Sequence, residues 1–313
     1  VPAGLMVPVS WFGIEEAPKA SIGLRPYLSL CGKLLQRKAF FYVMLFQFLS
    51  NLIASITTTA GGLVKNYWAG VQNLQNQLFS LVGSALFALG LWLVNKYLLN
   101  YSWRTMLFST TVLLNVLDMP FTFLTVFNVV RNQYFYLGET VLYEVPSAAN
   151  FVVATFIIVE MADEGNEGMV YGLLTTTANL GEPFGNAISN QLFGLFRPAL
   201  SDSGNYIEDT GRFRSVVALS FVVSYLFSFL SLLALPLLPS QKAEAQRRKR
   251  EWSENEGYMW FTIVLLSVCL AYSLTMNFLS LNESTMCLRI AGGEGCEEDE
   301  PGALLQAVAK LGS

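Results

Sequence analysis

Three acidic residues of this chain stand within two residues of a proline, inside stretches that are otherwise apolar. They are Asp118 with Pro120, Glu144 with Pro146, and Glu182 with Pro183. A proline removes one helix hydrogen bond and leaves a carbonyl oxygen without its donor, so polar backbone opens beside each acid. A charged group inside a bilayer is costly and usually faces a cavity or a partner. The pattern therefore predicts a water-lined pathway through a membrane protein, with Asp118 and Glu182 as proton-relay groups.

Each acid also has a purely structural interpretation. Glu182 can instead pair with an arginine or form hydrogen bonds with a neighbouring helix. Glu144 is close to the start of its apolar stretch, where a carboxylate can stay at the membrane surface. Asp118 lies deepest, within "LLNVLDMPFTFL", and the structural interpretation is weakest there.

The segment that carries Glu182 has two distinct faces. Small residues recur every four positions at Gly181, Gly185 and Ser189, a spacing that lets membrane helices approach closely. The polar residues around the same helix are Thr175, Thr176, Asn179, Glu182, Asn186 and Asn190. We expect the small face to pack tightly and the polar face, with Asn179 and Asn186, to line the pathway. The alternative is a helix that is held to its neighbours by polar contacts.

A run of carboxylates precedes this segment. Its members are Glu160, Asp163, Glu164 and Glu167. Gly165 and Gly168 mark the run as a turn between two helices. We expect a solvated acidic turn that pairs with Lys96 or Arg104 on the neighbouring cytoplasmic loop. Such pairs would fasten the two loops together or gate the pathway at this end.

The elements that hold these residues are apolar helices. Of the 313 residues, 53% are hydrophobic and 13% are charged, whereas soluble domains average about 25% charged residues. Apolar runs reach about twenty residues, the length at which a helix crosses a bilayer. The candidate spans are 39–60, 74–95, 104–129, 135–159, 169–196, 213–238 and 257–280. The fold class is therefore all-α, a polytopic membrane protein, in which the span carrying Glu182 is marginal because of its polar face.

The chain divides into five parts on this basis. These are a cytoplasmic loop with a short amphipathic helix (1–38), a six-helix transmembrane bundle (39–238), a charged basic linker (239–256), an additional transmembrane helix (257–280) and an acidic tail (281–313). The excess of Lys and Arg near span ends places the start of the first span in the cytoplasm. The basic run 247–250 directly follows a span, so we expect it to lie near anionic lipid and not to bind nucleic acid.

Several kinds of chemistry are excluded. The sequence has no histidine, which removes histidine metal sites and Ser-His-Asp catalysis. Its four cysteines form no Cys-x-x-Cys pair, so we expect no metal or redox motif. We also expect no cofactor and no enzyme activity. Cys287 and Cys296 lie in the tail, where an oxidising compartment would let them form a disulfide.

With these residues identified, three stretches resemble the folate–biopterin transporter family of the major facilitator superfamily. The first is the run that starts with "SITTTAGGLVKNYWAG". The second is "NVLDMPFTFLTVFNVVRNQYFYLGE" and the third is "FIIVEMADEGNEGMVYGLLTTTANLGEPFG". The resemblance implies alternating-access transport of folates or pterins, often with protons. It also implies two six-helix halves, of which this chain resembles the C-terminal half followed by one extra helix. We therefore expect a fragment whose missing N-terminal half, or a second copy, completes the pathway.

The candidate residues suit such a solute. The amino-pyrimidinone edge of a pterin presents adjacent N–H donors, which the carboxylate of Asp118 or Glu182 can accept in pairs. The pterin ring can stack on an aromatic side chain. The candidates are Tyr134, Phe135, Tyr136 and Tyr143. The glutamate tail of folate needs cations, and Arg104 and Arg131 are the bases at span edges in the central region.

The alternative function is that of a non-transporting multi-pass membrane protein, either a receptor-like sensor or the remnant of a split gene. Seven spans invite comparison with seven-helix receptors, but the charge bias puts the N-terminus on the cytoplasmic side, opposite to those receptors. A membrane-embedded enzyme is less well supported, because the sequence has neither histidine nor a Gly-x-Gly-Asp aspartyl pair.

Overall fold

The computed structural model describes residues 23–163, 165–282 and 284–288. The chain forms two compact units that divide between Leu34 and Leu35. The first unit ends inside α2 (Leu24–Gln36), a short helix with Lys33 in its last turn. The other helices of the described residues all belong to the second unit.

Helices account for nearly all the described residues of the second unit. They are α3 (Lys38–Ala54), α4 (Gly61–Leu63), the π-helix η1 (Val64–Trp68), α5 (Asn73–Leu93), the π-helix η2 (Val94–Leu98), α6 (Trp103–Val126), α7 (Gln133–Met161), α8 (Glu167–Phe193), α9 (Ser203–Glu208), α10 (Gly211–Ser231), the 3₁₀-helix η3 (Leu232–Leu237), α11 (Lys242–Glu251) and α12 (Glu256–Leu281). No strand occurs in the part of the chain that the structure describes. The prediction of an all-α fold is confirmed.

Among the described helices, five are long and apolar enough to cross a membrane. They are α5 with η2, α6, α7, α10 with η3, and α12. α3 is apolar but has only 17 residues, about 25 Å at 1.5 Å per residue. α8 has 27 residues, and its polar face keeps it below the hydropathy of a span. The polar face is also the reason why the predicted span 169–196 is marginal in the sequence.

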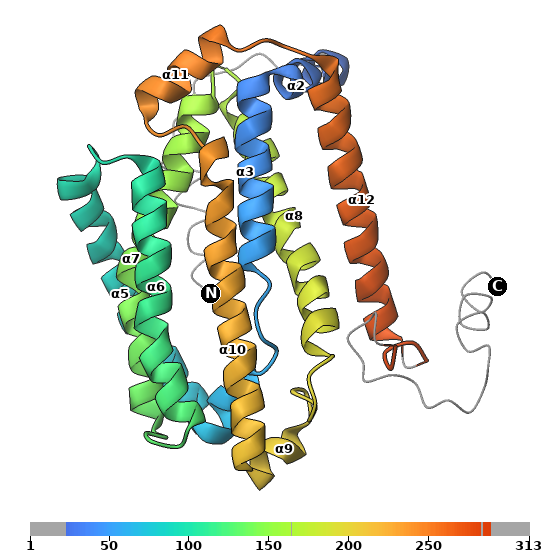
Figure 1. Cartoon of the computed structure of the whole chain (residues 1–313). Helices are drawn as coiled ribbons and strands as arrows, with labels where there is room; N and C mark the ends of the chain where they lie inside the picture. The colour runs from blue at the N-terminus through green and yellow to red at the C-terminus, as the bar shows by residue number, and fades with distance from the viewer. Residues whose placement is uncertain (1–22, 164, 283, 289–313) are drawn as a thin grey trace, which may run out of the picture. The chain divides into compact units, whose positions relative to one another are not determined.

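The helices of the second unit contact one another in a continuous series. α5 packs against α7, α7 against α6, α6 against α10, α10 against α3, α3 against α8, and α8 against α12. Figure 1 shows α3 between α10 and α8, with α12 beyond α8. A buried aromatic core gathers where η1, α9 and the start of α10 meet, around Trp68, Tyr206 and Phe213. This core fixes one end of the bundle that holds the candidate site.

The first expected span is interrupted. It was predicted to run over 39–60, but α3 ends at Ala54 and the chain is not helical again until Gly61. We refer to residues 55–60 as the unwound segment. The predicted span is wrong at its end because residues 55–60 contain neither proline nor glycine, and Gly61 and Gly62 come only after the break.

The unwound segment is held by hydroxyl groups of two other helices. The N–H of Thr57 donates to Ser189 Oγ of α8 at 3.0 Å, and the N–H of Thr58 donates to Ser224 Oγ of α10 at 2.7 Å. The hydroxyls of Thr58 and Ser220 share a further hydrogen bond of 2.7 Å. These bonds replace helix hydrogen bonds, as irregular backbone inside a membrane protein requires.

The three prolines, by contrast, do not end their helices. α6 continues through Pro120, α7 through Pro146 and α8 through Pro183. Packing against neighbouring helices outweighs the single backbone bond that each proline removes. The non-helical backbone between α3 and α4 is therefore not at a proline site.

Small residues bring α8 close to α3, as the sequence predicted. Gly181, Gly185 and Ser189 are buried. A methyl carbon added at Gly181 would lie 2.8 Å from Phe48 O, and one added at Gly185 would lie 2.9 Å from Ser55 Cβ. Ser189 takes part directly, since its Oγ is the acceptor that holds the unwound segment. The prediction of a close-packed small-residue face is confirmed.

Candidate functional site

A cavity of about 680 Å³ opens between α3, α6, α7 and α10, and we call it the central cavity. Its lining includes two carboxylates, Asp118 of α6 and Glu139 of α7, together with many hydroxyl and amide side chains. The unwound segment contributes Thr57 and Thr58. Among the described residues that line it there is no Lys and no Arg. Its volume lies in the range of small-molecule pockets, about 300–1,000 Å³.

Two hydroxyl groups hold Asp118 in place. Tyr225 Oη of α10 donates to Asp118 Oδ2 at 2.5 Å, and Thr122 Oγ1, one turn further along α6, donates to Oδ1 at 2.9 Å. A carboxylate has about four acceptor positions, so about two remain for a ligand. The side chain is therefore both oriented and still able to accept hydrogen bonds in the cavity.

Glu139 lines the central cavity although the proline pattern does not point to it. α7 presents Glu139, Tyr143, Asn150, Ala154 and Ile157 to the cavity. These positions are spaced by four, seven, four and three residues, as expected for one face of a helix. That spacing, which pairs Glu139 with Tyr143 one turn later, is the sequence signal that could have found it.

Only one of the four aromatic candidates for stacking lines the central cavity. Tyr143 is among the lining residues. Phe135 and Tyr134 pack on other aromatic rings at centroid distances of 4.8 and 6.2 Å, and Tyr136 packs against the aromatic core. The side chains of Tyr225 and Phe221 also border the cavity and were not predicted.

Glu144 lies between α5 and α7 and lines neither cavity described here. Gly83 of α5 makes room for its side chain, since a methyl carbon added there would lie 3.1 Å from Glu144 Cγ. Glu144 and Glu139 are five residues apart, which puts them on different faces of α7. Of the two acids, Glu139 faces the cavity that holds Asp118.

Glu182 lines a second cavity, separate from the one that holds Asp118. This cavity has a volume of about 420 Å³ and lies between α8 and α12; we call it the α8–α12 cavity. Asn179 and Asn186 line it together with Glu182, as the polar face of the helix suggested. The structure thus divides the candidate pathway residues between two places.

The acidic turn pairs with bases of α11 and of the start of α3. Asp163 lies 2.5 Å from Lys249 Nζ and 2.7 Å from Arg37 Nη1, and Glu160 lies 2.7 Å from Lys242 Nζ. Burial alone would raise the pKa of Asp163, but the hydrogen bonds and charges of Lys249 and Arg37 outweigh it and lower this pKa. The turn thereby fastens α7 and α8 to α11.

The expected partners of this turn, Lys96 and Arg104, are placed elsewhere, and that part of the prediction is wrong. Lys96 Nζ lies over the ring of Trp92, 4.8 Å from its centroid. Glu167 Oε1 accepts a hydrogen bond from the N–H of Gly165 at 3.0 Å. Glu164 lies outside the described residues. The sequence did not indicate that α11 would fold back over the turn and supply its bases.

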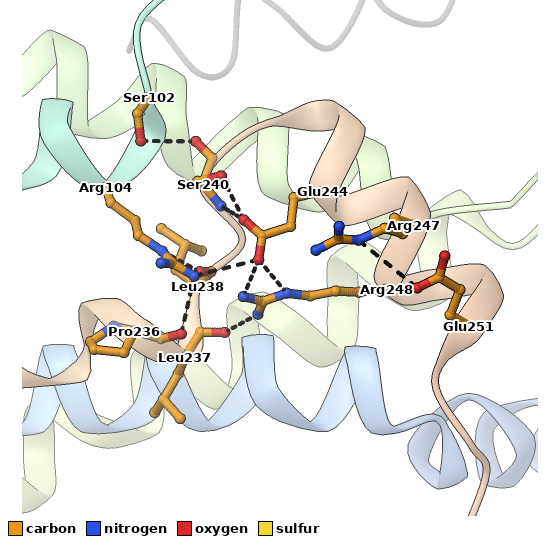
Figure 2. Close-up of polar contacts among 10 residues, drawn as sticks. All are labelled: Ser102, Arg104, Pro236, Leu237, Leu238, Ser240, Glu244, Arg247, Arg248 and Glu251. Atoms are coloured by element: carbon orange, nitrogen blue, oxygen red, sulfur yellow. Dashed lines mark hydrogen bonds and ion pairs between the residues drawn. The ribbon is translucent and has the colours of Figure 1, made fainter.

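Arg104 caps the end of η3. Figure 2 shows Arg104 donating to the carbonyl of Leu238 through Nε at 2.7 Å and to that of Pro236 through Nη2 at 3.2 Å. The carboxylate of Glu244 of α11 accepts from Arg248 and lies 3.6 Å from Arg104 Nη2. The network ties α6, η3 and α11 together at the end of the bundle where the acidic turn lies.

We expect Glu244→Gln to destabilise the folded protein by about 1–2 kcal/mol, because it removes a charge-assisted contact that is largely shielded from solvent. Burial alone would raise the pKa of Glu244, but hydrogen bonds from Ser240 and the charge of Arg248 hold it at about 2, below the usual 4.5. The stabilisation is therefore complete above the unfolded-state pKa and is lost as the pH falls toward 2. Unfolding of the purified protein in detergent between pH 7 and pH 3 measures it.

Glu251→Gln is the matched control on the same helix. Its carboxylate lies 3.9 Å from Arg247 Nε and is 66% exposed, and such a surface pair contributes about 0–0.5 kcal/mol. Equal losses for the two variants would contradict the assignment, as would a loss for Glu244→Gln that does not shrink at low pH.

Arg131, the other base considered for a folate tail, is also engaged outside the central cavity. Its Nη1 and Nη2 lie 2.7 and 2.9 Å from the two carboxylate oxygens of Asp209, which Arg214 also contacts. The guanidinium carbon of Arg131 lies 4.6 Å from the centroid of the Trp68 ring. Neither Arg104 nor Arg131 lines the central cavity.

The described residues contain no group of three or more His, Cys, Asp or Glu side chains that could hold a metal ion. Cys31 and Cys269 are free thiols. Cys287 is disulfide-bonded, whereas Cys296 lies outside the described residues. The pairing of these two cysteines therefore stays a prediction.

One comparison with known proteins, the match to a family model, agrees with the resemblance seen in the sequence. The model of the BT1 family matches residues 25–253. Nothing matches among curated proteins or among solved structures. The matched region includes Asp118, Glu139 and Glu182 and ends before α12 begins at Glu256.

Proposed function

Because this chain belongs to the BT1 family of folate–biopterin transporters and is a multi-pass membrane protein, we propose that it carries a pterin through the central cavity. One observation supports this choice of solute above the others. The cavity holds two carboxylates, is otherwise lined by hydroxyl, amide and apolar groups, and includes no base among its described lining residues. Such a lining favours a heterocycle rich in N–H donors.

Asp118 is the residue to which we assign recognition of the ring. The amino group and the neighbouring ring N–H of a pterin point in the same direction, and a carboxylate can accept both in a pair of parallel hydrogen bonds. Tyr225 and Thr122 leave about two acceptor positions of Asp118 unused. Tyr143, on the same face of α7 as Glu139, is the aromatic side chain placed to stack on the ring.

Asp118 and Glu139 are also our candidates for proton coupling. Two carboxylates that line one cavity can carry a proton and pass it from one to the other through the cavity. Binding of a solute with N–H donors favours the ionised form of its acceptor and would move that proton to the other carboxylate. Glu144 is left out of this pair because it lies against Gly83.

The remaining parts of the transport cycle are also proposals. The family resemblance implies two six-helix halves, and we propose that a second half, or a second copy of this chain, supplies the facing wall of the cavity. We assign the gate at the cytoplasmic end to the acidic turn, where Glu160 and Asp163 hold Lys242 and Lys249 of α11. Opening at this end would separate α11 from the turn.

We expect biopterin to bind the purified chain in lipid nanodiscs at least about tenfold more tightly than folate. The glutamate tail of folate adds negative charge to a cavity that has two carboxylates and no described base, and like charges at close range are unfavourable. Isothermal titration calorimetry of both compounds measures the ratio.

p-Aminobenzoylglutamate, which has the tail of folate without its pterin ring, is the matched control ligand and is expected not to compete with biopterin. Tighter binding of folate than of biopterin would contradict the proposed solute. So would competition by p-aminobenzoylglutamate, because it would mean that the tail and not the ring is recognised.

A further inference from the structure

The α8–α12 cavity contains a carboxylate that no described residue neutralises. Glu182 has neither an ion pair nor a hydrogen bond within the part of the chain that the structure describes, and the same is true of the side chains of Asn179, Asn186 and Asn190. These four positions are three or four residues apart and share one face of α8. All four residues are exposed to this open cavity, and a charged side chain in a membrane protein usually faces a cavity or a partner.

The facing wall of this cavity presents oxygen atoms. On α12, Asn277 Nδ2 donates to the carbonyl of Ser273 at 2.8 Å, and Ser280 Oγ donates to the carbonyl of Asn277 at 2.9 Å. These bonds use donors and leave Asn277 Oδ1 and the lone pairs of Ser280 Oγ as acceptors. No Lys or Arg is among the described lining residues. The cavity therefore offers one formal negative charge and several neutral oxygens.

We propose that the α8–α12 cavity binds a monovalent inorganic cation, with Glu182 as its charged ligand and the amide oxygens of Asn186 and Asn277 as neutral ligands. Oxygen atoms are the ligands that hard cations prefer. The single carboxylate matches one positive charge. A divalent cation would leave an excess of charge, and the described residues have no group of three acids to offset it.

The size of the cavity sets the hydration state of the ion. Its volume of about 420 Å³ exceeds that of a bare ion, and a water molecule occupies about 30 Å³. The cation therefore keeps part of its hydration shell, and the unpartnered amides of Asn179 and Asn190 act on that water. This arrangement also explains why four polar side chains of α8 face one place.

Contacts between α8 and α12 hold the two walls of the site together. Gln191 Nε2 donates to Tyr272 Oη at 2.6 Å, and the rings of Phe184 and Tyr272 meet edge to face at 4.8 Å. α12 lies outside the residues that the family model matches. The site is distinct from the central cavity and does not depend on the solute proposed for it.

The proposal is tested by thermal unfolding of the full chain in nanodiscs. The unfolding midpoint is compared in sodium chloride, potassium chloride and N-methyl-D-glucamine chloride at one ionic strength. We expect sodium or potassium to raise the unfolding midpoint by about 3 °C or more over N-methyl-D-glucamine, an organic ammonium ion that cannot be coordinated on all sides by oxygen atoms as an inorganic cation is. Glu182→Gln is expected to lose this shift. Asn277→Leu is a second variant that removes a neutral ligand and keeps the acid. Glu144→Gln, which changes an acid outside both cavities, is expected to keep the shift.

Binding of radioactive sodium or potassium to the wild-type chain is measured in parallel, so that the proposal can be tested even if Glu182→Gln does not fold. Saturable binding that Asn277→Leu weakens at least about tenfold supports the site. Equal midpoints in all three salts together with no saturable binding would overturn it. A full shift in Glu182→Gln would overturn it as well.

Discussion

Gly185→Ala is expected to destabilise the protein by about 3 kcal/mol or more, a large effect for one methyl group. The added carbon would lie 2.9 Å from Ser55 Cβ and closer still to the carbonyl oxygen of Leu52. Leu52 lies in the last turn of α3 and Ser55 begins the unwound segment, so only a displacement of backbone relieves the overlap. The thermal unfolding midpoint in detergent and the monodisperse fraction of the purified protein measure the loss.

Gly172→Ala is the matched control on the same helix. A methyl carbon added at Gly172 has no described atom within 4 Å, and alanine is favoured over glycine in a helix by about 1 kcal/mol. Its midpoint is expected to stay unchanged or to rise slightly. If Gly185→Ala proves as stable as Gly172→Ala, then α8 does not pack on α3 as closely as the structure has it.

The positions of most helices could be predicted from the sequence, because long apolar runs have few alternatives to a membrane helix. The span 135–159, for example, corresponds to α7 at Gln133–Met161. The unwound segment could not be predicted in the same way. It is stabilised by Ser189, Ser220 and Ser224, which stand more than 130 residues further along the chain, and "SITTTA" contains no residue that forbids a helix.

The candidate site was predicted only in part, and the reason is helix phase. Asp118 lies deep in its span, where a carboxylate is costly unless it faces a cavity or a partner. It does line a cavity. Glu139 and Glu144 both stand near the start of their span, and only the positions of Tyr143 and Asn150 on the same face distinguish them. The neighbouring proline drew attention to Glu144 instead.

Partners that come from distant segments were beyond the reach of the sequence. Glu182 lines a cavity whose second wall is α12, and nothing in the two segments indicates that they pack together. Likewise, the acidic turn finds Lys242 and Lys249 because α11 folds back over α7. Charge alone could not distinguish these bases from Lys96 and Arg104.

Asp118→Asn is expected to weaken biopterin binding about 100-fold. The substitution replaces two carboxylate oxygens by one amide oxygen and one NH₂ group, which would point a donor at the donors of the pterin. Loss of a charge-assisted hydrogen bond costs about 1.5–3 kcal/mol, and an unpaired donor adds to it. Tyr225 and Thr122 donate to different oxygens of Asp118, so in the variant one hydroxyl can still donate to the amide oxygen and the other can accept from the new NH₂ group. We therefore expect the fold to be kept.

The central claim, that a carboxylate of the central cavity recognises the pterin ring, is tested most directly by the dissociation constant of biopterin. It is measured by calorimetry for the wild-type chain, Asp118→Asn and Glu144→Gln, each in nanodiscs after size-exclusion chromatography has shown it to be folded. The account predicts a loss of about 100-fold for Asp118→Asn and a change of less than about threefold for Glu144→Gln. Wild-type affinity in a folded Asp118→Asn variant would contradict it.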